Sequence, residues 1–131
     1  MNLLLDTHIW LWLLEEPNRI ALGAYKQIES ATELVLSAAS VWELAIKTQL
    51  GRLNTNLAVA ELRQEILQEM AAKELVVTAA HALTAASLPL VHKDPFDRML
   101  VAQASIEGLT LVTADALMRR YGGAQIWAGN G

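Results

Sequence analysis

Four acidic residues, each placed where an apolar segment gives way to the start of a helix, are the side chains best suited to chemistry in this sequence. They are Asp6, Glu43, Asp97 and Asp115. Carboxylates gathered in one place bind divalent metal ions, and donor sets made only of oxygen select hard cations such as Mg²⁺ or Mn²⁺. If the fold brings these acids together, we expect metal-assisted chemistry.

Short apolar runs precede the first and the last of these acids. Residues 3–5 lead into Asp6, and residues 109–112 lead into Thr113 and Asp115. Such runs, bounded by polar residues and followed by helical periodicity, predict strands that are buried on both faces of a parallel sheet. In an open α/β sheet the ligand crevice lies outside the carboxyl ends of the strands, so we expect both acids to point into it.

Strands and helices alternate along the whole chain. Strands are predicted at 3–5, 33–37, 74–77, 109–112 and 125–127. Helices are predicted at 7–15, 38–50, 57–73, 79–86, 95–107 and 115–121, with a loop at 87–93. The pattern indicates a single α/β domain over residues 1–131, with a central parallel sheet of four to five strands flanked by helices on both faces.

The composition indicates more apolar residues than one core of this size would bury. The chain has 131 residues, 53% of them hydrophobic, and four tryptophans, so we expect another copy or a partner to cover part of the surface. Trp10, Trp12 and Trp42 are expected in the core or in such an interface. The apolar stretch 9–14 is well short of the roughly 18 residues that a membrane span needs. Without a signal peptide, a cytoplasmic location is expected.

Charge and cysteine content exclude two kinds of site. The absence of cysteine excludes thiolate metal sites and disulfides, and the net charge of −4 is opposite to that of proteins that hold nucleic acid by charge alone. A nucleic-acid substrate would therefore need metal ions to offset the acids. Five basic residues are candidates for phosphate contacts, although solvated or ion-paired side chains are commoner: Lys47, Lys93, Arg98, Arg119 and Arg120.

Each acid also has a purely structural explanation. Asp6 or Thr7 could cap the first helix, Asp115 could cap the last, and Asp94 before a proline is a good helix cap. Capping needs only local geometry, whereas these acids fall at positions that a doubly wound sheet brings to one edge. Taken together, their positions favour a shared site.

The two acids in the middle of the chain have local explanations as well. Residues 40–43 match the capping box, and Asp97 lies in a first helical turn, where the helix dipole favours negative charge. The histidines lack the paired spacing of a zinc helix. We expect His81 to be structural and His92 to be a surface contact. Thr7 and Thr113 could orient a carboxylate or a metal-bound water, or serve as ordinary cap and turn hydroxyls.

The ordered segments around these acids resemble the PIN-domain ribonucleases, and in particular the VapC-type toxins of bacterial type II toxin–antitoxin pairs. The segments are LLLDT at 3–7, SAASVWE at 37–43, DPFDRMLVAQ at 94–103 and LVTAD at 111–115. The resemblance covers essentially the whole chain. No segment is specific alone, but the ordered set is.

The resemblance implies a metal site and assigns its members. It places Mg²⁺ or Mn²⁺ on four acids, with Thr113 as an assisting hydroxyl and Thr7 as a less certain one. Glu43 would shape the site directly or through water, and the first ion would be bound by Asp6, Asp97 and Asp115. Asp94 is the alternative to Asp97 as the ligand from its segment.

The resemblance also implies a reaction and partners. It implies hydrolysis of RNA phosphodiester bonds in tRNA, rRNA or mRNA, a homodimer, and a cognate antitoxin protein whose segment blocks the groove. Two alternatives stay open. A phosphotransfer domain would usually need Asp-x-Asp after the first strand, where this chain has Asp6-Thr7-His8. A non-catalytic binding module would use the acids only as caps.

Overall fold

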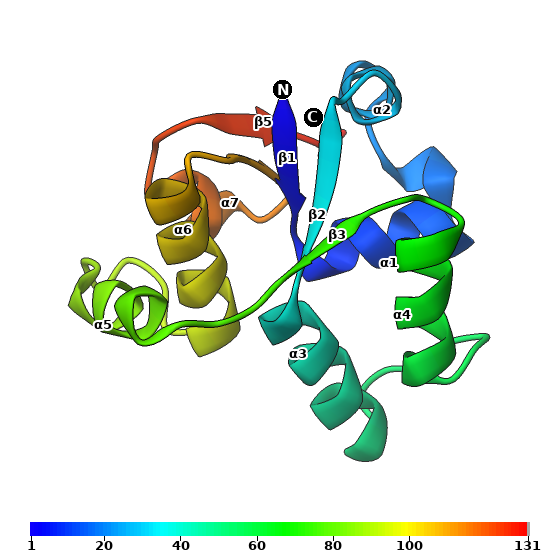
Figure 1. Ribbon diagram of the computed structural model, residues 1–131, viewed down its shortest axis with the longest axis horizontal. Coiled ribbons are helices and arrows are strands. Elements are labelled where there is room, and N and C mark those ends of the chain that lie inside the picture. The colour runs from blue at the N-terminus through cyan, green and yellow to red at the C-terminus, as the bar shows by residue number, and fades with distance from the viewer. Residues whose placement is uncertain (131) are drawn as a thin grey trace.

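Five parallel strands form the central sheet of the computed structural model, which describes residues 1–130 (Figure 1). They are β1 (Asn2–Leu5), β2 (Glu33–Ser37), β3 (Lys73–Leu75), β4 (Thr110–Thr113) and β5 (Gln125–Trp127). The strand order is β3-β2-β1-β4-β5, and every neighbouring pair is parallel. The order reverses direction between β1 and β4, and ligands of open α/β sheets bind at such a switch point.

Helices cover both faces of this sheet. They are α1 (Thr7–Glu15), the 3-10 helix η1 (Pro17–Arg19), α2 (Leu22–Glu29), α3 (Ala38–Gln49), α4 (Val59–Gln68), α5 (Ala79–Ser87), α6 (Pro95–Glu107) and α7 (Ala116–Arg119). The predicted α/β class, with its parallel sheet, is confirmed. No helix within residues 1–130 is both long enough and apolar enough to cross a lipid bilayer.

The apolar run in β1 supplies a core on each side of the sheet. Leu3 and Leu5 pack with Trp10 of α1 on one face, in a cluster that also includes residues of α2 and α4. Leu4 points to the opposite face and packs with Leu100 of α6. All five side chains are fully buried, and burial of one such side chain contributes about 1.5–3 kcal/mol. The absence of polar alternation in this strand is therefore explained by burial on both faces.

The boundary between α4 and β3 differs from the prediction. The helix predicted to reach residue 73 ends at Gln68, because Ala71 adopts a left-handed backbone conformation with φ of 52° that a helix cannot continue through. Lys73 instead begins β3, where it pairs with Val35 of β2. The strand predicted at 74–77 is therefore displaced, and Val76 lies outside it, largely exposed. The apolar stripe on α4 is confirmed, since Leu62 and Ile66 are buried.

Two helices between the first two strands were not predicted. A turn of 3-10 helix follows the proline that ends α1, and α2 then covers the edge of the first core with Ala24 and Ile28. These two residues are four positions apart, and the rest of the helix is mostly polar or exposed. Two small apolar contacts give too weak a periodicity to mark a helix of eight residues.

The tryptophans occupy different environments. Trp10 is fully buried in the core, as predicted, and Trp12 is half-buried with the guanidinium of Arg19 over its ring, 4.5 Å from the ring centroid. Trp42 is 63% exposed on α3 and meets Phe96 of α6 edge to face at 5.1 Å. Trp42 is thus outside the core, and it remains a candidate for an interface.

Candidate metal centre

Asp6 lies at the carboxyl end of the central strand, beside the switch point. Its N–H donates to the carbonyl of Val112 at 3.0 Å, which carries the β1–β4 pairing to the edge of the sheet. The carboxylate is 3% exposed; its Oδ2 accepts a hydrogen bond from the hydroxyl of Thr113 at 3.0 Å. Its Oδ1 has no hydrogen-bond partner among the described residues. A buried, unpartnered carboxylate oxygen is costly, and a cation would satisfy it.

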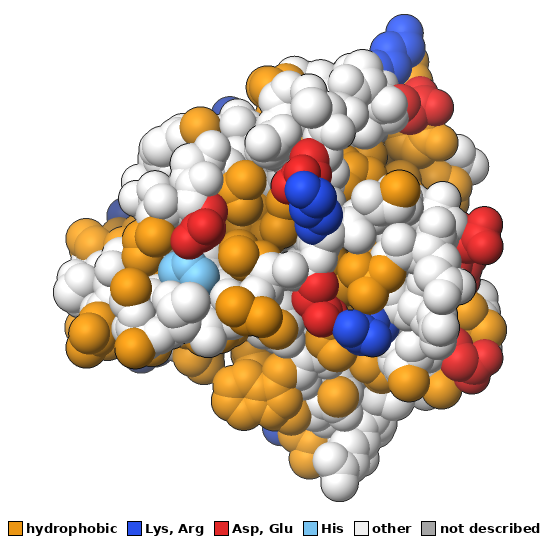
Figure 2. Space-filling view, viewed as in Figure 1, with side chains coloured by type: hydrophobic (Ala, Val, Ile, Leu, Met, Phe, Trp, Pro, Cys, Tyr) orange, Lys and Arg blue, Asp and Glu red, His pale blue; other side chains and the backbone are white. Residues whose placement is uncertain are grey.

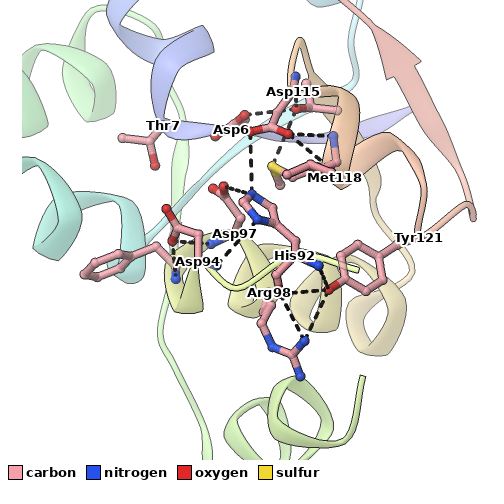
Figure 3. A network of polar contacts seen from close by, with 12 residues as sticks. Asp6, Thr7, His92, Asp94, Asp97, Arg98, Asp115, Met118 and Tyr121 are labelled. Carbon is pink, nitrogen blue, oxygen red and sulfur yellow. Dashed lines mark hydrogen bonds and ion pairs between the residues drawn. The ribbon is translucent and has the colours of Figure 1, made fainter. Parts of the chain in front are cut away.

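Thr113 and Asp115 form the second wall of the crevice. The Thr113 hydroxyl accepts a hydrogen bond from the N–H of Asp115 at 3.0 Å while it donates to Asp6. Asp115 caps α7, as predicted, because its Oδ1 accepts the N–H groups of Leu117 and Met118 at 2.8 and 3.2 Å. The cap uses one carboxylate oxygen only, which leaves Oδ2 facing the crevice near His92 (Figure 3).

The start of α6 brings two more acids to the same place. Asp94 caps the helix, as predicted, through bonds from the N–H groups of Phe96 and Asp97 to its Oδ1 at 2.9 and 3.3 Å. Asp97 then lies in the first turn with only 7% of its surface exposed. Figure 3 shows its carboxylate directed toward the ring of His92, below Asp6 and Asp115.

Glu43 reaches the site from α3, although not through the predicted capping box. Ser37, rather than Ser40, caps this helix by accepting the N–H of Ala39 at 3.0 Å, so Glu43 lies beyond the first turn. Glu43 is 1% exposed, and the Thr7 hydroxyl donates to its Oε1 at 2.7 Å. Neither Asp6 nor Thr7 caps α1 through its side chain. Thr7 therefore acts on an acid of the site.

Lys47 neutralises Glu43. Its ammonium group donates to Glu43 Oε2 one helical turn away. Burial lowers the pKa of Lys47, but the hydrogen bond and the charge of Glu43 outweigh it, and the net pKa lies above the ordinary value. The side chain that was a candidate for a phosphate contact is thus committed to an acid of the site. Both carboxylate oxygens of Glu43 have partners, in contrast to those of Asp6.

His92 belongs to the acidic cluster, and its prediction as a surface contact is wrong. Its side chain is 13% exposed, and its Nε2 lies 2.7 Å from Asp97 Oδ2 and 3.6 Å from Asp115 Oδ2. His92 is buried because Asp94 caps α6. The chain turns at Asp94 to enter the helix, and this turn brings His92, two residues earlier, over the first turn of α6. The sequence signal was a histidine just before a capping aspartate and proline.

Arg98, one of the five candidates for phosphate contacts, has a structural role instead. The residue is 8% exposed, and its guanidinium donates only to groups of the protein. Its acceptors are the carbonyls of Ala85, Ala86, Leu88, Pro89 and His92 and the hydroxyl of Tyr121, at 2.9–3.3 Å. It therefore ties the end of α5 and the following loop to α6. His81 is structural as predicted: it is buried and completes a capping box with Thr78 at the start of α5.

Crowding of carboxylates perturbs their protonation. Burial raises the pKa of Asp97 to about 8, assisted by the charges of Asp6, Asp94, Glu43 and Asp115. Burial also raises the pKa of Asp6 to about 6, although His8 and the hydrogen bond from Thr113 oppose the change. Because like charges in a buried site cannot all ionise, the acids hold a proton near neutral pH unless a cation takes its place.

The ligand atoms form two overlapping groups that share Asp97. One atom each from His92, Asp97 and Asp115 lie within 4.8 Å of one another, and so do atoms from Glu43, Asp94 and Asp97. These groups contain Glu43, Asp97 and Asp115 of the four predicted acids, with Asp94 and His92 added. Asp6 belongs to neither group, although it lies close enough for its charge to raise the pKa of Asp97. Buried carboxylate oxygens, one of them without a partner within residues 1–130, fit a divalent cation, so the residues present suit the metal that the resemblance implies.

The sequence and the fold are similar to those of known proteins. The family model of the PIN domain matches residues 3–124. The chain is 33% identical over 121 residues to Ribonuclease VapC22 of Mycobacterium tuberculosis. The aligned residues make up 92% of this chain and 92% of that relative. The fold is similar to a chain in the crystal structure of VapBC2 from Rickettsia felis bound to a DNA fragment from its promoter, with a TM-score of 0.70, 14% identity and coverage of 98% and 99%.

A second solved structure has the same fold. A chain of FitAcB from Neisseria gonorrhoeae superimposes with a TM-score of 0.62 at 20% identity, covering 95% of this chain and 96% of that one. The family match spans the strands and helices that carry all four predicted acids. The chain therefore belongs to the PIN-domain family and is of the VapC type.

Proposed function

We propose that this protein is a metal-dependent endoribonuclease that hydrolyses RNA phosphodiester bonds and acts as the toxin of a toxin–antitoxin pair. The observation that carries the proposal is that Asp6, Asp97 and Asp115 lie close enough at this edge of the sheet to act on one another by charge, and that Asp6 Oδ1 is buried without a partner among the described residues. The name of the relative from Mycobacterium tuberculosis, a ribonuclease, supports RNA as the substrate.

The cofactor in this proposal is Mg²⁺ or Mn²⁺, held by Asp6, Asp97 and Asp115 with Glu43 beside them. Such an ion supplies a more acidic water and offsets charge on the phosphodiester. The protein's residues fix the geometry. The Thr113 hydroxyl orients Asp6 and Thr7 orients Glu43.

Thr113 and Thr7 accordingly serve as positioning residues in the proposed mechanism. Each hydroxyl holds one oxygen of a buried carboxylate, which limits rotation of that side chain. The Lys47 ammonium group balances the charge of Glu43 in a crowded site. The substrate phosphate would approach from the side where Asp115 is half-exposed, since the other acids lie deeper.

The proposed partners are a second copy of the chain and a cognate antitoxin protein. Hydrophobic side chains gather in Figure 2 over the half of this face that contains α3, α5 and α6. Trp42, Leu83 and Leu90 are 63%, 74% and 85% exposed, and apolar side chains that gather on one face mark interaction surfaces. An apolar cavity of about 400 Å³, lined by Trp42, Phe96 and Met99 among others, lies beside the acids and suits an antitoxin segment that blocks the site.

Cleavage of purified RNA tests the proposal. Total cellular RNA and structured tRNA are incubated with the wild type in Mg²⁺, in Mn²⁺ and in EDTA, and in parallel with Asp6→Asn. Glu61→Gln is the matched control, because Glu61 is an exposed acid in the first turn of α4, far from the cluster in sequence. We expect cleavage that requires metal, survives in the control and is lost in Asp6→Asn. Cleavage equal in both variants, or none in any condition, would support a binding module instead.

A further inference from the structure

We propose that His92 is a nitrogen ligand of the cation held between Asp97 and Asp115, and that it biases the site toward Mn²⁺ over Mg²⁺. The inference rests on the proposed function to the extent that a divalent cation binds at this edge of the sheet. It departs from an all-oxygen donor set, which is what the four acids alone provide.

The geometry around the ring supports coordination. Nε2 of His92 lies 2.7 Å from Asp97 Oδ2 and 3.6 Å from Asp115 Oδ2, and the three atoms belong to one group that could hold an ion. Neighbouring ligands of an octahedral ion at about 2.1 Å lie about 3 Å apart, so the two observed distances straddle the required value. Figure 3 shows the ring reaching up between the two carboxylates, with Asp6 above.

The position of His92 is built into the fold rather than left to a surface loop. Its N–H contacts the Tyr121 hydroxyl at 3.2 Å, and its carbonyl accepts a bond from Arg98 at 3.3 Å. Arg98 and Tyr121 also contact each other at 3.2 Å, and the Tyr121 hydroxyl donates to the carbonyl of Pro89 at 3.0 Å. Two buried or half-buried side chains thus fix the backbone from which the imidazole points at the acids.

A second observation concerns Asp6, which neighbours this group. Its Oδ1 is buried without a hydrogen-bond partner among the described residues, while the Thr113 hydroxyl bonds both Asp6 Oδ2 and the N–H of Asp115. Asp6 belongs to neither group of ligand atoms within 4.8 Å, but its charge acts on Asp97. Asp6 therefore adds a buried, unsatisfied acceptor next to the group formed by His92, Asp97 and Asp115.

Nε2, rather than Nδ1, is the ring nitrogen available for coordination. Nε2 shares a hydrogen bond with Asp97 Oδ2 at 2.7 Å and is directed at the acids. Nδ1 faces the N–H of Asp94 at 3.5 Å, at the limit of a hydrogen bond, and points away from the two carboxylates. Imidazole favours transition ions, whereas Mg²⁺ prefers oxygen, and the expected consequence is selectivity for Mn²⁺.

Electron spin echo measurements on the full-length protein with Mn²⁺ test the assignment. A directly bound imidazole gives a ¹⁴N modulation, which we expect in the wild type and not in His92→Gln. Titrations should show that His92→Gln weakens Mn²⁺ binding by roughly tenfold or more, since even outer partners of metal ligands contribute on that scale. Mg²⁺ binding should change much less. Circular dichroism establishes that the variant is folded.

Two further variants make the result specific. His8→Gln removes an exposed imidazole that acts on Asp6 by charge alone, and it should keep both the ¹⁴N modulation and the metal preference. Tyr121→Phe loosens the backbone of His92 and should weaken Mn²⁺ binding by a smaller factor. Mn²⁺ that binds without ¹⁴N modulation would overturn this inference and leave the proposed function standing. A wild type that binds no Mn²⁺ would overturn both.

Discussion

Replacing Asp97 by asparagine should stabilise the metal-free protein. Asparagine has nearly the same shape but no charge, so the variant removes one of several repelling acids from a buried cluster. The carboxylate is 7% exposed, and burial together with the charges of its neighbours raises its pKa to about 8. The wild type must therefore either keep a proton on Asp97 at neutral pH or ionise it against its surroundings.

The raised pKa of Asp97 sets the size of the expected gain in stability. The ordinary value is 3.8 and the folded value is about 8, so at pH 7 the folded state holds a proton that the unfolded chain has released. At about 1.4 kcal/mol per pH unit, this costs at most about 4 kcal/mol. Asparagine also alters the hydrogen bond with His92 Nε2, which reduces the gain. With relaxation of the site, a net gain of about 1–3 kcal/mol remains, or roughly 3–12 °C in Tm.

Thermal melts at pH 7 in EDTA measure this gain. Glu61→Gln is the matched control, because Glu61 occupies the corresponding position in the first turn of α4 but is exposed and uncrowded. The control should melt at or slightly below the wild-type temperature, and Asp97→Asn should melt above it. Addition of Mn²⁺ should raise the Tm of the wild type and leave Asp97→Asn nearly unchanged. An Asp97→Asn protein that melts no higher than the control would refute the idea of a crowded acid cluster.

Two further predictions concern pH and Arg98. An acid whose folded pKa is raised contributes stability that is present below its unfolded pKa and lost as pH rises through its folded pKa. The pKa of Asp97 is raised to about 8 and that of Asp6 to about 6, so the Tm measured in EDTA should fall as the pH rises from about 4 to about 8. The fall should be shallower in Asp97→Asn. A wild-type Tm that does not change with pH would contradict this. Arg98→Met should lower the free energy of unfolding, measured in urea, by about 2–4 kcal/mol, because several buried carbonyls lose a charged hydrogen-bond donor. Unchanged stability together with weaker RNA binding would instead indicate that Arg98 contacts phosphate.

The strands could be predicted from sequence because their signal is local. A continuous apolar run such as Leu3–Leu5 marks a strand buried on both faces, and the order of acids after such runs indicates which edge they share. The end of α4 could not be predicted in this way. Its register depends on Lys73 pairing with β2, and Ala71 adopts a left-handed conformation that alanine rarely prefers.

The site was less predictable where the contacts of a long side chain depend on the tertiary structure. His92 and Arg98 carry no periodic signal, and a basic residue in a polar segment is usually solvated. Their burial follows from tertiary contacts: the carbonyls at the end of α5 surround Arg98, and two carboxylates from different elements surround His92. The same holds for Ser37 and Ser40, of which either could cap a helix by sequence, and the strand end decides in favour of Ser37.

Capping and metal binding are compatible roles for one carboxylate, and Asp115 separates them experimentally. Its Oδ1 caps α7 and its Oδ2 faces the crevice, so each role uses a different oxygen. Asparagine is as good a helix cap as aspartate, whereas alanine costs about 1 kcal/mol. Removing this charge also relieves repulsion on Asp97, so Asp115→Asn should keep or slightly raise the metal-free Tm and lose most of the Mn²⁺-induced rise. Asp115→Ala should lose that rise and the stability of the cap. If Asp115→Asn kept the full response to Mn²⁺, Asp115 would be a cap alone, and the ion would have to be held by Asp6 and Asp97 without it.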